Sequence, residues 1–284
     1  MRWQGRRGST NVEDRRGMSP RGIATGGGIG IIGFVAIYLI VRMLGGDPSQ
    51  VLQQIQEGTG QPSATSYEAS AEEDAMAQFV SVVLADTEDV WKKLFEESGS
   101  AYREPSLVLF RDQTQSGCGY ATGASGPFYC AADEKVYIDL AFCDDLVNKL
   151  GAYGDFAVAY VIAHEVGHHV QNLVGTLDAV NQQRAKLNER RANQLTVQLE
   201  LQADFLAGMW AHHAQEMLNI LEAGDIEEAL NAAAAVGDDA IQMKYQGRVV
   251  PDSFTHGTSE QRREWFQKGW ETGDYSQGDT FSSL

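Results

Sequence analysis

The run from Val161 to His169, VIAHEVGHH, constrains this chain more than any other stretch of it. His164 and His168 are four residues apart, so on a helix both imidazoles project from the same face, one turn apart. Two imidazoles placed in this way can occupy two corners of a tetrahedral zinc site, leaving room for a third protein ligand and a water. Glu165 lies beside them, where a carboxylate can take a proton from that water. The HExxH pattern is therefore typical of a zinc metallopeptidase.

A second pair of side chains, Glu200 and Asp204, is also four residues apart on a segment with helical periodicity. We expect Glu200 to be the third zinc ligand and Asp204 to orient one of the zinc histidines from behind. The alternative is a helix with a buried, hydrogen-bonded histidine pair and no metal. The extended metzincin pattern fails here, because its glycine and third histidine would fall on Gln171 and Val174.

Two further histidines, His212 and His213, follow Asp204 by about two helical turns. They are the ligands that a different zinc architecture would use. Eight residues carry His212 about 12 Å farther along the helix axis. We therefore predict that neither binds the metal of the HExxH site and that both lie either on the surface or behind its ligands.

Long strings of this sequence resemble the bacterial neutral zinc metallopeptidase family of small membrane-anchored proteins. They are MRWQGRR, NVEDRR, GPFYC, VYIDL, YVIAHEVGHHVQ, ELQADF with the following AG, and GRVVPDSFTHGTSEQR. The resemblance implies a gluzincin with zinc held by two histidines and a glutamate. One departure is that family members often have cysteine where this chain has Phe205, and another near Gly278. If those cysteines pair in relatives, this chain lacks that disulfide.

The periodicity of the remaining segments predicts an α+β, mostly helical domain with a small β-sheet over residues 71–284. Only two strands are expected, at 106–111 and 135–140. Helices are expected at 71–99, 155–174, 177–221 and 226–236, and another after Thr258. By resemblance to gluzincins, a strand of this sheet lines the cleft and pairs with substrate. The second strand, with Val136, Tyr137, Ile138 and Asp139, is our candidate; a purely structural strand is the alternative.

Residues 1–22 are rich in arginine and are predicted to be a basic cytoplasmic segment, the alternative being an arm that binds nucleic acid. Residues 23–41 carry no charge and would span about 28 Å as a helix, close to the thickness of a bilayer core. This predicts one transmembrane anchor over residues 23–44, with a cleaved signal peptide as the alternative. Residues 45–70 are predicted to be a flexible linker.

The charge distribution fits an anchored protein. Residues 1–44 hold seven basic and two acidic residues, while the remainder holds 15 and 37, a net charge of −22. An acidic domain of this kind does not bind nucleic acid non-specifically. With the arginines on the inner side, the sequence predicts a single-pass protein of the bacterial cytoplasmic membrane whose catalytic domain is extracytoplasmic.

Three cysteines are consistent with an oxidising compartment. Cys118 and Cys130 flank a glycine-rich loop and are a candidate disulfide; two free buried thiols are the alternative. Cys143 is left over and is expected to pack as a small apolar side chain.

Near the C-terminus, Thr258 and Gln261 form a capping box that leaves His256 in a loop before a helix. The spacing from His256 to Arg262 is similar to an element of integral-membrane CAAX-type endopeptidases. By that resemblance either side chain is a candidate donor to the oxyanion of a tetrahedral intermediate. A structural role at the helix entry is the alternative.

These features together predict a membrane-anchored zinc endopeptidase that acts on protein or peptide substrates with one Zn²⁺ per chain. His164, His168 and Glu200 would hold the metal. A zinc-activated water, deprotonated by Glu165, would attack the peptide carbonyl. The alternative is a non-catalytic, zinc-stabilised module that binds other envelope proteins.

Overall fold

The computed structural model describes residues 1–18 and 67–282. Within it, Met1–Arg15 and Ser70–Leu284 form one compact unit, and the description below concerns that unit. The predicted anchor at 23–44 and nearly all of the predicted linker lie outside the described residues. In the part of the chain that is described, no helix is both long and apolar enough to cross a membrane.

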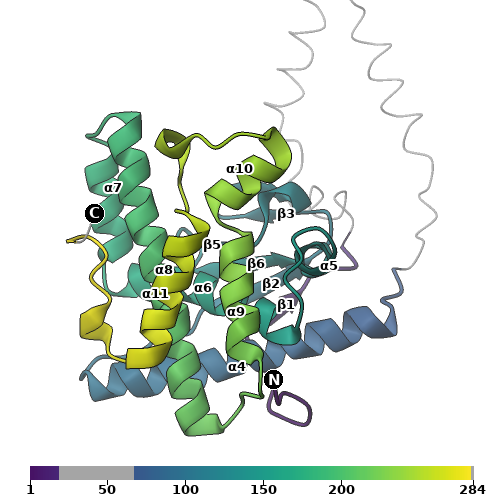
Figure 1. The fold of residues 1–284 in the computed structure, drawn as a ribbon. Coiled ribbons are helices and arrows are strands. Elements are labelled where there is room, and N and C mark those ends of the chain that lie inside the picture. The colour runs from purple at the N-terminus through teal and green to yellow at the C-terminus, as the bar shows by residue number, and fades with distance from the viewer. Residues whose placement is uncertain (19–66, 283–284) are drawn as a thin grey trace, which may run out of the picture. The chain divides into compact units, whose positions relative to one another are not determined.

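The unit contains a four-stranded sheet in the order β1-β2-β6-β5 (Figure 1). Its strands are β1 (Val12–Asp14), β2 (Ser106–Phe110), β5 (Phe128–Cys130) and β6 (Lys135–Asp139). Strands β1, β2 and β6 run parallel to one another, and β5 pairs antiparallel to β6. A separate hairpin joins β3 (Gln113–Ser116) to β4 (Gly119–Thr122). Strands β2 and β6 confirm the prediction, whereas the other four strands were not predicted.

Both faces of the sheet are buried, and alternate residues point to opposite faces. One face packs into the main core through Leu107, Leu109, Val136 and Ile138. The other face forms a smaller apolar cluster of Val108, Phe110, Cys130 and Tyr137. Burial on both faces explains why β2 is a nearly continuous apolar run.

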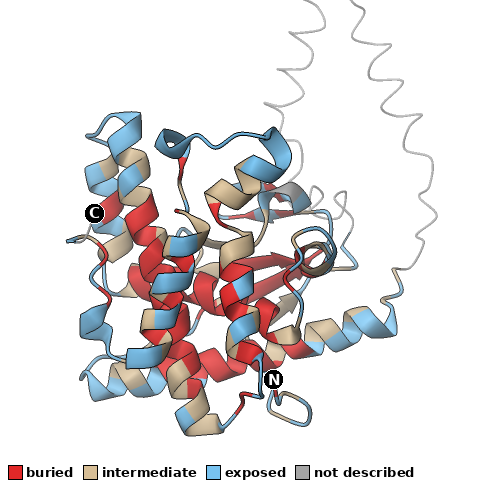
Figure 2. Ribbon diagram, viewed as in Figure 1, coloured by how far each residue is buried: buried red, intermediate tan, exposed pale blue. Residues whose placement is uncertain are grey.

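The described residues also form eight helices, which confirms an α+β, mostly helical protein. They are α4 (Ala71–Glu97), α5 (Leu140–Asn148), α6 (Asp155–Leu173), α7 (Thr176–Arg184), α8 (Glu189–Leu218), α9 (Asp225–Ala235), α10 (Asp238–Gln246) and α11 (Ser259–Thr272). Figure 2 shows that buried residues concentrate in the sheet, in α6 and in the middle of α8. The helix that carries HExxH is thus the most enclosed one, as its apolar sequence indicates.

One predicted helix is wrong in its extent. A single helix over 177–221 was expected, but α7 ends at Arg184 and α8 begins at Glu189. The Asn188 side chain accepts a hydrogen bond from the backbone N–H of Arg191 at 3.0 Å, which makes it the N-cap of α8. Helices α5 and α10 were not predicted at all.

Met1–Arg15, which fall in the predicted N-terminal segment 1–22, belong to the same compact unit as the predicted domain at 71–284. β1 pairs with β2, and the Met1 amino group lies 2.6 Å from Asp155 Oδ1, at the start of α6. Arg6 pairs with the buried Asp86 of α4.

Cys118 and Cys130 form a disulfide, and Cys143 is a buried free thiol. The bond ties the β3–β4 hairpin to the edge strand β5. Phe205 and Gly278 are in contact. A Cβ added to Gly278 would lie 2.6 Å from Cε1 of Phe205, so the phenyl ring occupies the space beside the glycine.

Candidate metal centre

The centre is formed where α6 crosses α8, at a point of close backbone approach. A Cβ added to Gly167 would lie 3.1 Å from the carbonyl oxygen of Ala203 and 3.3 Å from its Cα. Any larger residue at 167 would push the two helices apart. The glycine that weakens α6 as a helix therefore brings Glu200 of α8 within reach of His164 and His168.

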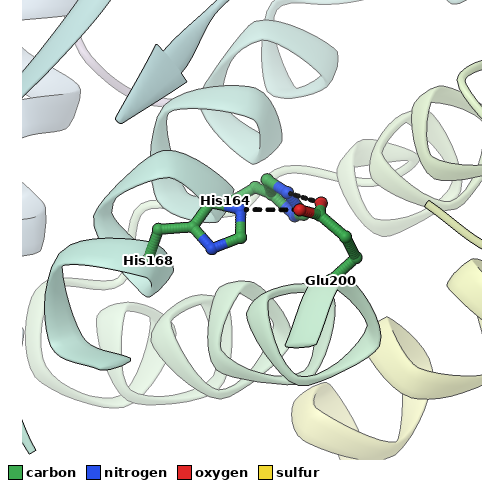
Figure 3. Close-up of side chains that lie close together, drawn as sticks. All are labelled: His164, His168 and Glu200. Atoms are coloured by element: carbon green, nitrogen blue, oxygen red, sulfur yellow. Dashed lines mark hydrogen bonds and ion pairs between the residues drawn. The ribbon is translucent and has the colours of Figure 1, made fainter. Parts of the chain in front are cut away.

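The three predicted ligands converge in the structure, as Figure 3 shows. His164 Nε2 lies 3.2 Å from Glu200 Oε2, and His168 Nε2 lies 3.5 Å from Glu200 Oε1. The two imidazole rings are nearly perpendicular, with centroids 4.8 Å apart. All three side chains are largely buried.

These separations fit a zinc ion. Ligand atoms about 2.0–2.2 Å from a tetrahedral zinc lie about 3.3–3.6 Å from one another. Two imidazoles and one carboxylate are also a donor set that catalytic zinc uses, with its fourth position open. The residues present therefore fit the metal that the sequence predicts.

Asp204 holds His164 from behind, as the sequence predicts. Its Oδ1 lies 2.8 Å from His164 Nδ1 and accepts a hydrogen bond from Tyr160 at 2.5 Å. Arg262 donates to both carboxylate oxygens, through Nε at 2.8 Å and Nη2 at 2.9 Å. With Nδ1 held as a donor to this carboxylate, the Nε2 lone pair of His164 faces Glu200 and the metal position.

Charge also favours a cation at this centre. Burial raises the pKa of Asp204, but Arg262 and His164 outweigh it and hold the pKa at about 2. Burial likewise raises the pKa of Glu200, and the two histidines outweigh it and lower the pKa well below its usual range. Two buried carboxylates thus face one buried guanidinium. Burial lowers the pKa of both histidines, but Asp204 and Glu200 outweigh it and raise the pKa of His164 to about 10 and that of His168 above its usual value. In the metal-free protein, protons on the two imidazoles therefore balance the carboxylates, and a metal ion that replaces those protons would supply the same balance.

The second histidine is oriented by a residue that the sequence reasoning missed. His168 Nδ1 lies 2.9 Å from Gln171 Oε1. The amide of Gln171 in turn donates to the carbonyl of Leu199 at 2.8 Å and to Gln202 at 3.1 Å, both on α8. A buried glutamine one turn after the second histidine of HExxH was the available signal. The metzincin comparison identifies Gln171 only as the residue that replaces the glycine of that pattern.

Arg262 was predicted as a candidate oxyanion donor, and the structure gives its guanidinium other partners. Besides Asp204, it donates to the Tyr160 hydroxyl at 3.1 Å and the Val236 carbonyl at 3.3 Å, and it is 3% exposed. Tyr160, one turn before His164, was also missed. Arg262 and Tyr160 therefore hold Asp204 in place.

A cleft of about 530 Å³ opens onto the ligands, and Glu165 lines it beside them. Its walls come from the segment leading into β5, from α7 and α8, and from the start of α10. Glu165 is 7% exposed, so its carboxylate is shielded from bulk water while facing the cavity. This is the position that a proton-transferring carboxylate requires.

His256 also lines this cleft, on the side of α10. Its Nδ1 lies 3.1 Å from Asp238 Oδ1, and its imidazole is half-exposed. The other oxygen of Asp238 accepts backbone N–H bonds from Thr255, His256 and Gly257. Asp238, which the sequence reasoning missed, therefore fixes both the loop and the ring of His256.

The predicted substrate strand is wrong. Val136, Tyr137, Ile138 and Asp139 form β6, which pairs with β2 on one side and with β5 on the other. Its backbone has no free side for a peptide. The edge strands of the sheet are β1 and β5. Phe128 and Tyr129 of β5 line the cleft, together with Ser125, Gly126 and Pro127.

Comparison with known proteins agrees with this site. Residues 1–281 match the family described as "Putative neutral zinc metallopeptidase". The chain is 50% identical over 291 residues to "Uncharacterized protein YpfJ" of Escherichia coli K12, covering 99% of both proteins. It is 40% identical over 257 residues to "Uncharacterized protein Rv2575" of Mycobacterium tuberculosis H37Rv, covering 85% of both. No solved structure shows a significant match. The chain belongs to the neutral zinc metallopeptidase family.

Proposed function

We propose that this protein is a zinc-dependent endopeptidase of gluzincin type. The proposal rests on one observation: His164, His168 and Glu200 lie close together in a cleft that Glu165 also lines. Zinc bound to that set would polarise a peptide carbonyl and lower the pKa of a coordinated water to about 7. A purely structural zinc site would have no use for an open cleft or for an enclosed carboxylate beside the ligands.

In this mechanism Glu165 is the general base and then the general acid. Its carboxylate takes a proton from the attacking water and passes it to the leaving amine. His256 also lines the cleft. With its Nδ1–H paired to Asp238, its doubly protonated form would donate Nε2–H to the oxygen of the substrate carbonyl as negative charge develops there. Asp238 keeps that imidazole in place. Gln171 and Asp204 keep the two zinc histidines in the tautomers that leave Nε2 free to bind metal.

The substrate is proposed to bind as an extended peptide along β5. An edge strand presents a row of backbone donors and acceptors to which a peptide can add as a further strand. β5 lies beside α6 and lines the cleft, so a peptide paired with it would pass over Glu165. The disulfide from Cys130 to Cys118 holds the end of this strand.

Replacing Glu200 by Gln tests the ligand set. We expect zinc occupancy to fall sharply, because a neutral amide is a much weaker ligand than a carboxylate and the centre loses one negative charge. Metal analysis of the purified full-length protein, dialysed against a fixed low zinc concentration, measures the loss. Glu264→Gln, the same change at an exposed site on α11, is the control. Full occupancy in the Glu200 variant would exclude this residue as a ligand.

We further infer that residues 1–15 and 70–282 lie on the same side of any membrane that the chain contacts. The inference is supported by the β1–β2 pairing and by the ion pairs of Arg6 and Arg7 with α4. A single crossing between Arg15 and Ser70 would break all of these contacts. The Cys118–Cys130 disulfide favours an extracytoplasmic compartment for this unit. We propose that residues 23–44 contact the membrane.

Two cysteine labels test this arrangement. Thr10→Cys and Ala75→Cys place exposed thiols before and after the apolar stretch. In intact cells, a membrane-impermeant maleimide is expected to label both variants or neither, since both sites belong to one folded unit. Cell lysates give the total label for comparison. Labelling of Ala75→Cys alone would instead support a single crossing and would refute the inference.

A further inference from the structure

We propose a second divalent-metal site, made by His212, His213 and Glu216 near the C-terminal end of α8. One ligand atom from each of the three residues lies within 4.8 Å of the others. His212 Nε2 is 3.5 Å from Glu216 Oε1, and His213 Nδ1 is 3.6 Å from Glu216 Oε2. These distances are close to the roughly 3.3–3.6 Å that separates neighbouring ligands of a tetrahedral zinc.

The other nitrogen of each ring is held by a backbone carbonyl at the end of α11. His212 Nδ1 lies 2.7 Å from the carbonyl oxygen of Trp270, and His213 Nε2 lies 2.8 Å from that of Gly273. A carbonyl only accepts, so each of these nitrogens carries the proton. The nitrogen that is left on each ring, His212 Nε2 and His213 Nδ1, is the one that faces Glu216 and would bind a metal ion. Histidines that bind metals are oriented in this way by the hydrogen bond of their second nitrogen.

The turn that ends α11 is shaped around these rings. Gly273 has a φ of +58°, and a Cβ added there would lie 2.4 Å from His212 Cδ2 and 2.7 Å from its Nε2. Any side chain at this position would displace the imidazole from the cluster. None of the three proposed ligands lines the cleft. This site is thus distinct from the HExxH centre, about 12 Å along α8 from Asp204.

The donor set selects the class of metal. Two imidazole nitrogens and one carboxylate oxygen suit Zn²⁺, Co²⁺, Ni²⁺ or Cu²⁺, whereas Mg²⁺ and Ca²⁺ prefer oxygen ligands alone. Glu216 is 63% exposed, so the ion would exchange readily and bind more weakly than at the buried centre. An ion there would hold the end of α8 to the end of α11 and stabilise the pair.

Calorimetric titration of metal-free, full-length protein with Zn²⁺ tests the proposal. We expect two classes of site, a tighter one that Glu200→Gln removes and a weaker one that His213→Gln or Glu216→Gln removes. In the Glu200→Gln protein, saturating zinc should raise the melting temperature, and adding His213→Gln should abolish that rise. Glu264→Gln is the charge-matched control and should leave both classes intact.

Other outcomes would overturn the proposal. A single class of site in the wild type would show that the cluster is only an ion pair between Glu216 and protonated histidines. A weak class that survives both His213→Gln and Glu216→Gln would show adventitious binding elsewhere on the acidic surface. Equal melting temperatures of the metal-free variants and wild type would confirm that the substitutions leave the fold intact. Because the readouts are metal content and stability, the result is independent of peptidase activity.

Discussion

Replacing Glu165 by Gln is expected to lower turnover of a peptide substrate by about 10²- to 10⁴-fold, the usual contribution of general acid–base catalysis. The amide keeps the size and shape of the side chain but cannot take up a proton. Glu165 is not among the three converging ligands, so zinc content should remain that of the wild type. Steady-state kinetics at equal zinc occupancy measure the effect.

His256→Ala provides the comparison. It should also retain zinc and should lose less activity, because one hydrogen-bond donor to the oxyanion is removed while the proton transfer remains. Asp238→Asn should resemble His256→Ala, since Asp238 positions the ring. Equal turnover in Glu165→Gln and wild type would refute the assignment of the base.

Replacing Asp204 by Asn should lower the free energy of unfolding by about 3–5 kcal/mol, the range found when one partner of a buried ion pair is removed. Asp204 is fully buried, and its carboxylate pairs with Arg262 and accepts from Tyr160. The neutral amide would leave the guanidinium buried without a counter-charge. Urea denaturation in the presence of chelator measures this change without the added effect of zinc binding.

The matched variant is Asp204→Asn combined with Arg262→Met. Removing the unpaired guanidinium should return part of the lost stability, because the cost arises from the remaining buried charge. A loss below about 1 kcal/mol for Asp204→Asn alone would contradict the buried network.

The parts of the site that repeat within a helix were predictable from the sequence. His164 and His168 share one face of α6, and Glu200 and Asp204 share one face of α8, because residues four apart on a helix are neighbours. The close approach of the two helices depends on Gly167, which has no side chain to hold α8 away from α6. The capping box at Thr258 and Gln261 is present and starts α11. Helical spacing and the capping-box pattern were sufficient to predict the two pairs of site residues and the start of α11.

What the sequence did not reveal depends on contacts between distant segments. β1 is three residues long and pairs with a strand more than 90 residues away, so no local pattern marks it. The edge position of β5 follows from the strand order, which alternation of side chains does not determine. Tyr160, Gln171 and Asp238 act by hydrogen bonds within the folded site. Their residue types are common in helices and loops without such roles.

Digestion of a broad peptide library by the zinc-loaded full-length protein, read out by mass spectrometry, tests the central claim most directly. The account predicts cleavage that stops with chelator, returns when zinc is restored, and is absent with Glu165→Gln at equal zinc content. Wild-type protein that carries full zinc and cleaves no peptide, under conditions where a known metallopeptidase digests the library, would contradict the account. The protein would then be a zinc-stabilised binding module.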